Sequence, residues 1–112
     1  MVENKKYIPQ RGDIVWLNFD PQKGHEQKGK RPALVLSPKE YNKKVGLAIF
    51  CPITSKIKNY PFEVKISGEI EGAILTDQIK SLDWQKRKAT YIMKVGLQVI
   101  KEVQENLQML LL

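Results

Sequence analysis

The sequence predicts a mainly β fold, a small antiparallel barrel or folded sheet with one α-helix at the C-terminal end. Two patterns indicate this: many short strand-like segments separated by turn residues, and one final segment with the apolar spacing of a helix. The length of 112 residues leaves room for one hydrophobic core and little room for a second. We therefore expect a single domain over residues 1–112.

The strand-like segments share a short length, β-branched or aromatic residues, and turn residues at their ends. In the fourth segment Phe62, Val64 and Ile66 alternate with polar residues, as in a strand with one buried face. A proline is expected to end each of the first three. The strands are expected at residues 14–19, 33–36, 47–51, 62–66, 73–75 and 90–93, with 79–84 continuing or pairing with the fifth.

The final segment changes to a helical period. Its apolar residues are three or four positions apart, with Lys, Glu and Gln between them. This spacing predicts an amphipathic helix over about residues 96–111. The apolar positions are Leu97, Ile100, Val103, Leu107 and Leu110.

The charge of the chain predicts a polyanionic partner. Nineteen Lys and Arg against twelve Asp and Glu give a formal net charge of +7. Such a balance favours contacts to phosphates with release of counterions, so a nucleic acid is the expected partner. The alternative is a solvated basic surface that aids solubility.

Cysteine content and hydropathy indicate the compartment. No apolar run approaches the roughly 20 residues that span a bilayer, and no signal-peptide pattern is present. Cys51 is the single cysteine, so no internal disulfide forms and a reducing compartment, the cytoplasm, is expected. With one Cys and one His a four-ligand zinc site is not expected, and no cofactor motif is present. We expect neither a metal nor a cofactor, and no membrane partner.

The polar segment from residue 20 to 32 is the first candidate for chemistry. It contains two glycines and two prolines, as in a loop between strands, and holds His25, Glu26 and Arg31. A base, an acid and a cation in one loop suit phosphoryl chemistry. The alternatives are a solvated loop and a structural ion pair for Arg31. Pro32 favours extended backbone at Arg31, at the junction of loop and strand.

Two further polar clusters follow predicted strands. Thr54, Ser55 and Lys56 offer hydroxyls and a charge to phosphate oxygens, although an ordinary turn fits the same residues. Asp77 and Gln78 offer a carboxylate and an amide for base edges, again with turn chemistry as the alternative.

Other residues with chemical potential are expected in the core. Cys51, Trp16 and Trp84 are interpreted as packed side chains and not as a nucleophile or stacking platforms. The single His excludes a ribonuclease mechanism with two histidines in one protomer.

Several blocks in order resemble the MazF/PemK/Kid toxins. The most specific is the GxEQxxxRP signature from Gly24 to Pro32, and the resemblance extends over about residues 7–111. The other blocks are Gly12 to Trp16, Phe19 to Pro21, Val35 to Pro38, Tyr41-Asn42, Pro52 to Ser55, Tyr60 to Val64, and Asp77 to Ser81.

The resemblance implies an SH3-like barrel of the CcdB/Kid/MazF type with a C-terminal helix. It also implies a symmetric homodimer and an endoribonuclease that cuts single-stranded RNA without a metal. The products would be 2′,3′-cyclic phosphate and 5′-hydroxyl ends. A cognate antitoxin protein would occupy the RNA-binding groove.

The resemblance also implies roles for residues. The family's catalytic Arg and Thr fall on Arg31 and Thr54. A fixed guanidinium suits the charge of a phosphorane, and Glu26 is the carboxylate placed to orient or deprotonate the 2′-hydroxyl. In the Kid branch catalytic roles fall on positions His25 and Asp77, but the Arg that precedes that Asp is Leu75 here, which shifts weight to Arg31. RNA binding is expected at Lys30, Ser55, Lys56, Asp77 and Gln78.

Two other functions fit the same chain. The CcdB toxins share the barrel, bind DNA gyrase and cut nothing, so a gyrase-binding toxin is the main alternative. A non-catalytic RNA-binding module is the second.

Overall fold

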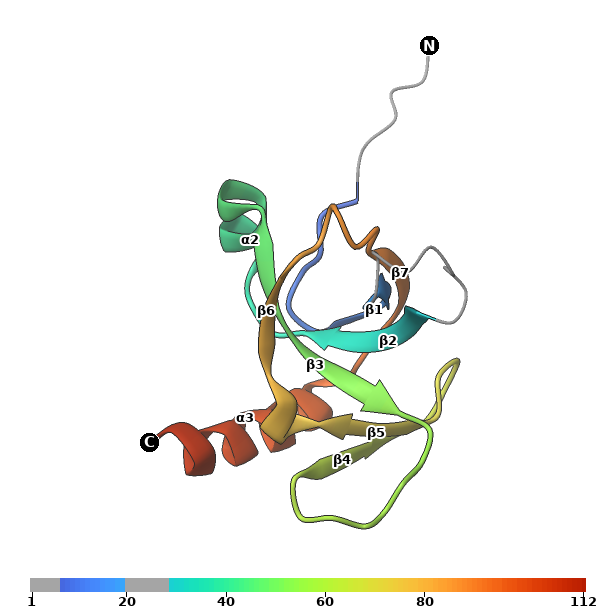
Figure 1. Cartoon of the computed structure of the whole chain (residues 1–112). Helices are drawn as coiled ribbons and strands as arrows, with labels where there is room; N and C mark the ends of the chain where they lie inside the picture. Colours follow the sequence, from blue (N-terminus) through green and yellow to red (C-terminus); the bar gives the residue numbers. More distant parts are fainter. Residues whose placement is uncertain (1–6, 20–28) are drawn as a thin grey trace.

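The computed structural model describes residues 7–19 and 29–112. Strands and helices alternate with short turns along this part of the chain (Figure 1). The elements are β1 (Asp13–Asn18), β2 (Lys30–Val35), α2 (Lys39–Val45), β3 (Leu47–Thr54), β4 (Glu63–Ile66), β5 (Gly72–Leu75), the short 3₁₀ helix η1 (Thr76–Gln78), β6 (Lys80–Asp83), β7 (Thr90–Lys94) and α3 (Leu97–Leu111).

The strands form one curled antiparallel sheet, a half-barrel, in the order β4-β5-β3-β2-β1-β7, with β6 paired to β3. β3 is the central strand because it pairs with β6 and β2 along its first part and with β5 at Ile53 and Thr54. The helix α3 lies against the β4–β5 side of the sheet (Figure 1). The predicted mainly β barrel-type fold with a C-terminal helix is confirmed.

Both faces of β1 are largely buried, because one face packs in the core that includes α3 and the other lies inside the curl of the sheet. Neighbouring residues of β1 therefore enter different cores: Ile14 packs with Leu34 and with Val103 of α3, whereas Val15 packs with Phe50 inside the curl. This explains why the first strand reads as a continuous apolar run instead of an alternating one.

The helix α2 is absent from the sequence prediction. Its seven residues are too few for a helical period to be recognised, and its side chains are mostly exposed. Tertiary contacts hold it: Asn42 is fully buried, its Nδ2 donates to the Pro9 carbonyl at 2.8 Å, and its own carbonyl accepts from Trp84 Nε1 at 2.9 Å. Packing, and not intrinsic propensity, therefore makes this segment helical.

Two strand boundaries differ from the prediction near the expected site. β2 begins at Lys30, so Arg31 lies inside the strand and not at a loop junction. β3 continues through Pro52 to Thr54, although the proline was expected to end it. Pro52 lies where β3 changes neighbour from β2 to β5, a position where a missing backbone N–H is tolerated.

Candidate active site

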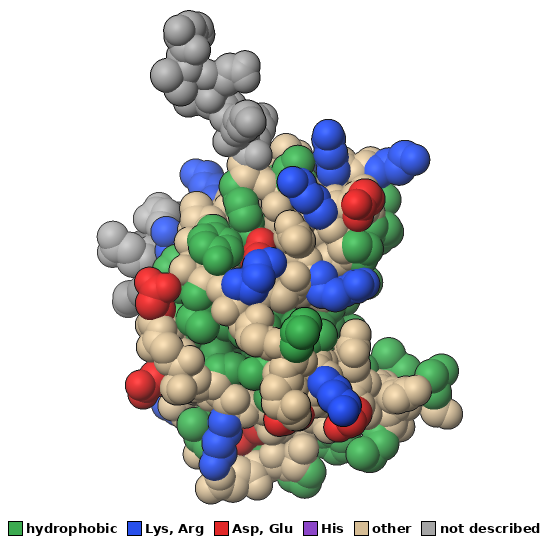
Figure 2. Space-filling view, turned by 180° about the vertical axis from the view of Figure 1, so that it is seen from behind, with side chains coloured by type: hydrophobic (Ala, Val, Ile, Leu, Met, Phe, Trp, Pro, Cys, Tyr) green, Lys and Arg blue, Asp and Glu red, His purple; other side chains and the backbone are tan. Residues whose placement is uncertain are grey.

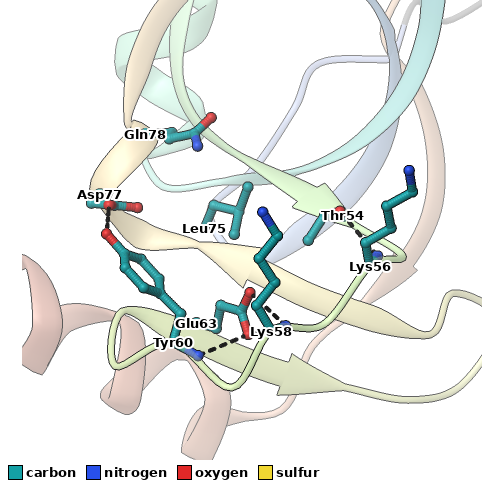
Figure 3. Close-up of a pocket in the computed structure, with 8 residues that line it drawn as sticks. All are labelled: Thr54, Lys56, Lys58, Tyr60, Glu63, Leu75, Asp77 and Gln78. Carbon is teal, nitrogen blue, oxygen red and sulfur yellow. Dashed lines mark hydrogen bonds between the residues drawn. The ribbon is translucent and has the colours of Figure 1, made fainter.

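Two cavities meet at the end of β3 in the described part of the chain. One has a volume of about 530 Å³ and is lined by residues that include Arg31, Thr54 and Glu69. The other, about 340 Å³, is lined by residues that include Thr54, Tyr60 and Asp77 (Figure 3). Because Thr54 and Lys56 line both, the two cavities form one continuous candidate site.

Arg31 enters the first cavity from β2. Its strand register opposite Leu17 of β1 sets the backbone position, and its side chain is exposed. The only ion pair among the described residues joins Lys94 to Asp13 at 2.8 Å, so within that part of the chain Arg31 makes no structural ion pair. An exposed guanidinium in a cavity can bind a phosphate with two parallel hydrogen bonds.

Thr54 is the last residue of β3 and is half-buried. Its Oγ1 accepts the backbone N–H of Lys56 at 3.0 Å. This hydrogen bond is typical of the turn that the sequence analysis gives as the alternative for these residues. This bond occupies an acceptor site and leaves the hydroxyl proton able to donate to a substrate oxygen.

Gly72 of β5 allows the close approach that positions Thr54. A Cβ on Gly72 would lie 2.2 Å from the Thr54 carbonyl oxygen, which no real side chain permits. The pairing of Thr54 with Ala73 thus depends on glycine at the preceding position of β5.

The second cavity is lined by β3, β4, β5 and η1 and by the segment that joins β3 to β4. Asp77 lies on η1 and accepts a hydrogen bond from the Tyr60 hydroxyl, while Glu63 begins β4 (Figure 3). The hydrogen bond to Asp77 is the main cause that raises the pKa of Tyr60 above its usual value. Tyr60 therefore remains a neutral donor at physiological pH, with Leu75 forming an apolar part of the same cavity.

The structure brings most of the predicted site residues together. Arg31, Thr54, Ser55 and Lys56 line the first cavity, and Thr54, Lys56, Asp77 and Gln78 line the second. Lys30 is exposed at the start of β2 but lines neither cavity. His25 and Glu26 lie outside the described residues.

Sequence reasoning missed several residues that line the cavities. Trp16 was interpreted as core, yet it is half-buried and lines the Arg31 cavity. The continuous apolar run of β1 gives no local signal that sets Trp16 apart from buried Val15 and Leu17. Lys58, Tyr60 and Glu63 also line the second cavity. The only signal for them in the sequence is that the Tyr60 to Val64 block belongs to the family resemblance.

Cys51 is a core residue, as predicted. It is fully buried and packs with Leu34, Ile53 and Ile74. Burial, with a further contribution from the charge of Asp77, raises the pKa of the Cys51 thiol to about 12. The thiol is therefore protonated at neutral pH and is not a nucleophile.

The described residues show no feature of a metal site or of a membrane-spanning helix. Residues 7–19 and 29–112 contain no group of three or more His, Cys, Asp or Glu side chains arranged to hold a metal ion. In the same residues we find no helix with the length and apolar character needed to cross a membrane. Lys and Arg side chains are scattered over the face in Figure 2, interspersed with Asp and Glu.

Comparison with known proteins gives close matches in sequence. A sequence model of the PemK-like, MazF-like toxins of type II toxin–antitoxin systems matches residues 10–111. The endoribonuclease toxin MazF of Escherichia coli K12 is 52% identical over 86 residues, covering 76% of this chain and 78% of the relative. The endoribonuclease toxin ChpB of the same strain is 38% identical over 111 residues, covering 93% and 95% of the two chains.

Solved structures match equally well. MazF from Deinococcus radiodurans superimposes with a TM-score of 0.85 at 48% identity, covering 95% of this chain and 98% of that one. MazF in a MazE–MazF complex from the same organism gives a TM-score of 0.84 at 42% identity, covering 95% and 97%. With a family model that spans almost the whole chain and relatives at this identity, the chain belongs to the PemK-like, MazF-like toxins of type II toxin–antitoxin systems.

Proposed function

We propose that this chain is an endoribonuclease toxin that cleaves single-stranded RNA in the cytoplasm as a single domain and is neutralised by a cognate antitoxin. The observation that carries the proposal is that Arg31 of β2 and Thr54 of β3 line one cavity. The relatives named endoribonucleases and the MazE–MazF complexes support the same activity and the same kind of partner.

The proposed reaction is an internal transesterification. The ribose 2′-hydroxyl attacks the adjacent phosphorus and gives its proton to a base, and the 5′-oxygen leaves with a proton, so the products are a 2′,3′-cyclic phosphate and a 5′-hydroxyl. Arg31 would bind the extra negative charge of the phosphorane, and Thr54 would donate a hydrogen bond to a phosphate oxygen. Neither role requires a metal ion.

The candidates for proton transfer are proposed from the sequence of the 20–32 segment and from the family resemblance. Glu26 is the proposed group that orients or deprotonates the 2′-hydroxyl, with His25 as its neighbour in the same segment. Asp77 is proposed as an RNA-binding residue instead of a base, because its carboxylate already accepts the Tyr60 hydroxyl. Gln78, Ser55, Lys56 and Lys30 are proposed to contact the RNA around the cavities.

RNA cleavage in the presence of EDTA tests this function. Purified protein incubated with single-stranded RNA and excess EDTA should produce fragments whose ends are 2′,3′-cyclic phosphates and 5′-hydroxyls, as mapped by end-specific ligation. Intact RNA with a tight gel shift would instead support the non-catalytic binder. Intact RNA with inhibition of DNA gyrase would support the CcdB-like alternative.

We also propose that the toxin is a homodimer. The resemblance implies one, and the C-terminal end of α3 leaves apolar side chains exposed: Met109 by 72%, Leu111 by 65% and Leu112 by 96%. Figure 2 shows hydrophobic side chains on this protruding end, at the lower right. An unpaired apolar end of this kind is typical of an interface.

Sedimentation at micromolar concentration should give the mass of two chains. Leu111→Glu together with Leu110→Glu should shift the equilibrium toward one chain, because two charges would then be desolvated at the interface. Lys101→Glu, an exposed change on the same helix, serves as the control. A monomeric wild-type protein would contradict the proposal.

A further inference from the structure

The segment between β3 and β4, residues 55–62, forms much of the second cavity. It carries Lys56, Lys58 and Tyr60, which are exposed and line the 340 Å³ cavity (Figure 3). None of these residues belongs to a helix or strand. The shape of the segment therefore depends on contacts other than regular helix or strand hydrogen bonds.

Glu63 supplies the first set of contacts. Its two carboxylate oxygens accept the backbone N–H of Lys58, each at 3.2 Å, and Oε1 also accepts the N–H of Tyr60 at 3.4 Å. The Glu63 N–H in turn donates to the Tyr60 carbonyl at 3.0 Å. Between them Asn59 has a φ of 58°, the left-handed region that asparagine tolerates. One residue at the start of β4 thus holds a tight turn with both its backbone and its side chain.

A second set of contacts joins the same turn to η1. The Tyr60 hydroxyl donates to Asp77, and the Tyr60 ring meets Phe62 edge to face with centroids 6.0 Å apart. η1 is itself anchored, because Thr76 Oγ1 donates to the Phe62 carbonyl at 2.7 Å and accepts from Asn106 of α3 at 3.3 Å. The turn is therefore connected through η1 to the C-terminal helix.

The charge of Glu63 is unexpected in a cavity that is proposed to bind RNA. A carboxylate repels phosphates, and this one forms no ion pair with any lysine or arginine of the described residues. Its oxygens instead face the backbone N–H groups of Lys58 and Tyr60 (Figure 3). A hydrogen bond from a neutral donor to a charged acceptor is stronger than one between neutral groups, which suits a residue that orders a turn.

We propose that Glu63 is a positioning residue for RNA binding. It acts through the 55–62 segment, which it holds in the shape that presents Lys56, Lys58 and Tyr60 to the substrate. The inference rests on the proposed RNA-cleaving function. The reacting phosphate is assigned to Arg31 and Thr54, whereas the Glu63 carboxylate accepts from the backbone of Lys58 and Tyr60. Loss of Glu63 therefore changes substrate binding and leaves the chemical step intact.

The first test uses two variants of the full-length protein to separate the hydrogen-bonding role of the Glu63 side chain from the effect of its negative charge. The substrate is a fluorescent single-stranded RNA oligonucleotide that carries one cleavage site mapped with the wild-type protein. Glu63→Ala removes the acceptor and is expected to raise KM about tenfold while kcat stays within about twofold of wild type. Glu63→Gln keeps an oxygen for the Lys58 and Tyr60 N–H groups, and its KM is expected within about threefold of wild type.

Other outcomes of the kinetic test overturn the proposal. If both variants lower KM, Glu63 is only a repulsive charge. If both variants raise KM equally, the negative charge of Glu63, and not its hydrogen-bond acceptor, determines RNA binding. If kcat falls with KM unchanged, Glu63 acts on the chemical step.

The second test does not depend on RNA. Amide exchange of Lys58 and Tyr60 in the free protein, measured by NMR, should be faster in Glu63→Ala than in wild type and close to wild type in Glu63→Gln. Unchanged exchange in Glu63→Ala would overturn the positioning role whatever the enzyme does. A third result is possible: the Lys58 and Tyr60 amides exchange faster in Glu63→Ala, but the wild-type protein cuts no RNA. In that case Glu63 still positions the turn, and only the proposed function and the role in RNA binding are overturned.

Discussion

Replacing Arg31 with alanine is expected to lower kcat for RNA cleavage by on the order of 10²–10³, the usual cost of removing one donor to transition-state charge. The guanidinium is exposed in the 530 Å³ cavity that Thr54 shares, where two parallel hydrogen bonds can bind the phosphorane oxygens. Its contribution grows as negative charge develops on phosphorus, so kcat should fall more than KM rises. Single-turnover cleavage of an RNA oligonucleotide measures the chemical step directly.

Two further variants make the Arg31 result specific. Arg31→Lys keeps the charge but loses the planar pair of donors, so its rate should lie between those of wild type and Arg31→Ala. Arg11→Ala removes an arginine that donates to the Leu36 carbonyl and lines neither cavity of the site, so kcat should remain near wild type. If Arg31→Ala cleaves RNA at the wild-type rate, the proposed mechanism is wrong.

Replacing Asn42 with alanine is expected to lower the free energy of unfolding by about 3 kcal/mol. The side chain is fully buried, and its Nδ2 donates to the carbonyls of Pro9 at 2.8 Å and Ser37 at 3.1 Å. Its Oδ1 accepts from Ser37 Oγ at 2.5 Å. The variant would leave these buried groups without partners and would release α2 from the sheet.

Urea denaturation followed by tryptophan fluorescence checks the Asn42 prediction. Trp84 donates to the backbone carbonyl of Asn42 at 2.9 Å, a contact that the substitution keeps, so its fluorescence reports on the loss of α2 packing as the protein unfolds. Lys43→Ala, at the next and exposed position of α2, should change the free energy of unfolding by less than about 0.5 kcal/mol. Equal effects of the two changes would show that α2 is held by its own propensity and not by Asn42.

The strands and the final helix were predictable because their signal is local. A strand or helix that buries a face leaves an apolar period in its own sequence, as at Val64 and Ile66 in β4 or Ile100 and Val103 in α3. The helix α2 carries no such period, because a single buried residue, Asn42, holds it by polar contacts to residues far along the chain.

The candidate site was predictable only in part. Arg31 and Thr54 are predicted as catalytic residues because the family resemblance marks them. The composition of their segments alone favours a solvated loop and an ordinary turn. Tyr60, Glu63 and Trp16 went unrecognised as site residues, since each reads as an unremarkable residue of a strand or turn. Only the sheet order β4-β5-β3 and the packing of η1 against β3 show that Glu63 and Asp77 share a cavity with Thr54.

The sequence by itself determined that this is a basic, mainly β chain with a C-terminal amphipathic helix and the motifs of a toxin family centred on Arg31. The tertiary structure decided what surrounds Arg31 within the described residues. β3 changes neighbours at its end, Gly72 lets β5 approach Thr54, and the 55–62 turn is tied to η1. These contacts join residues far apart in sequence, so they depend on strand register and sheet curl, which no local pattern encodes.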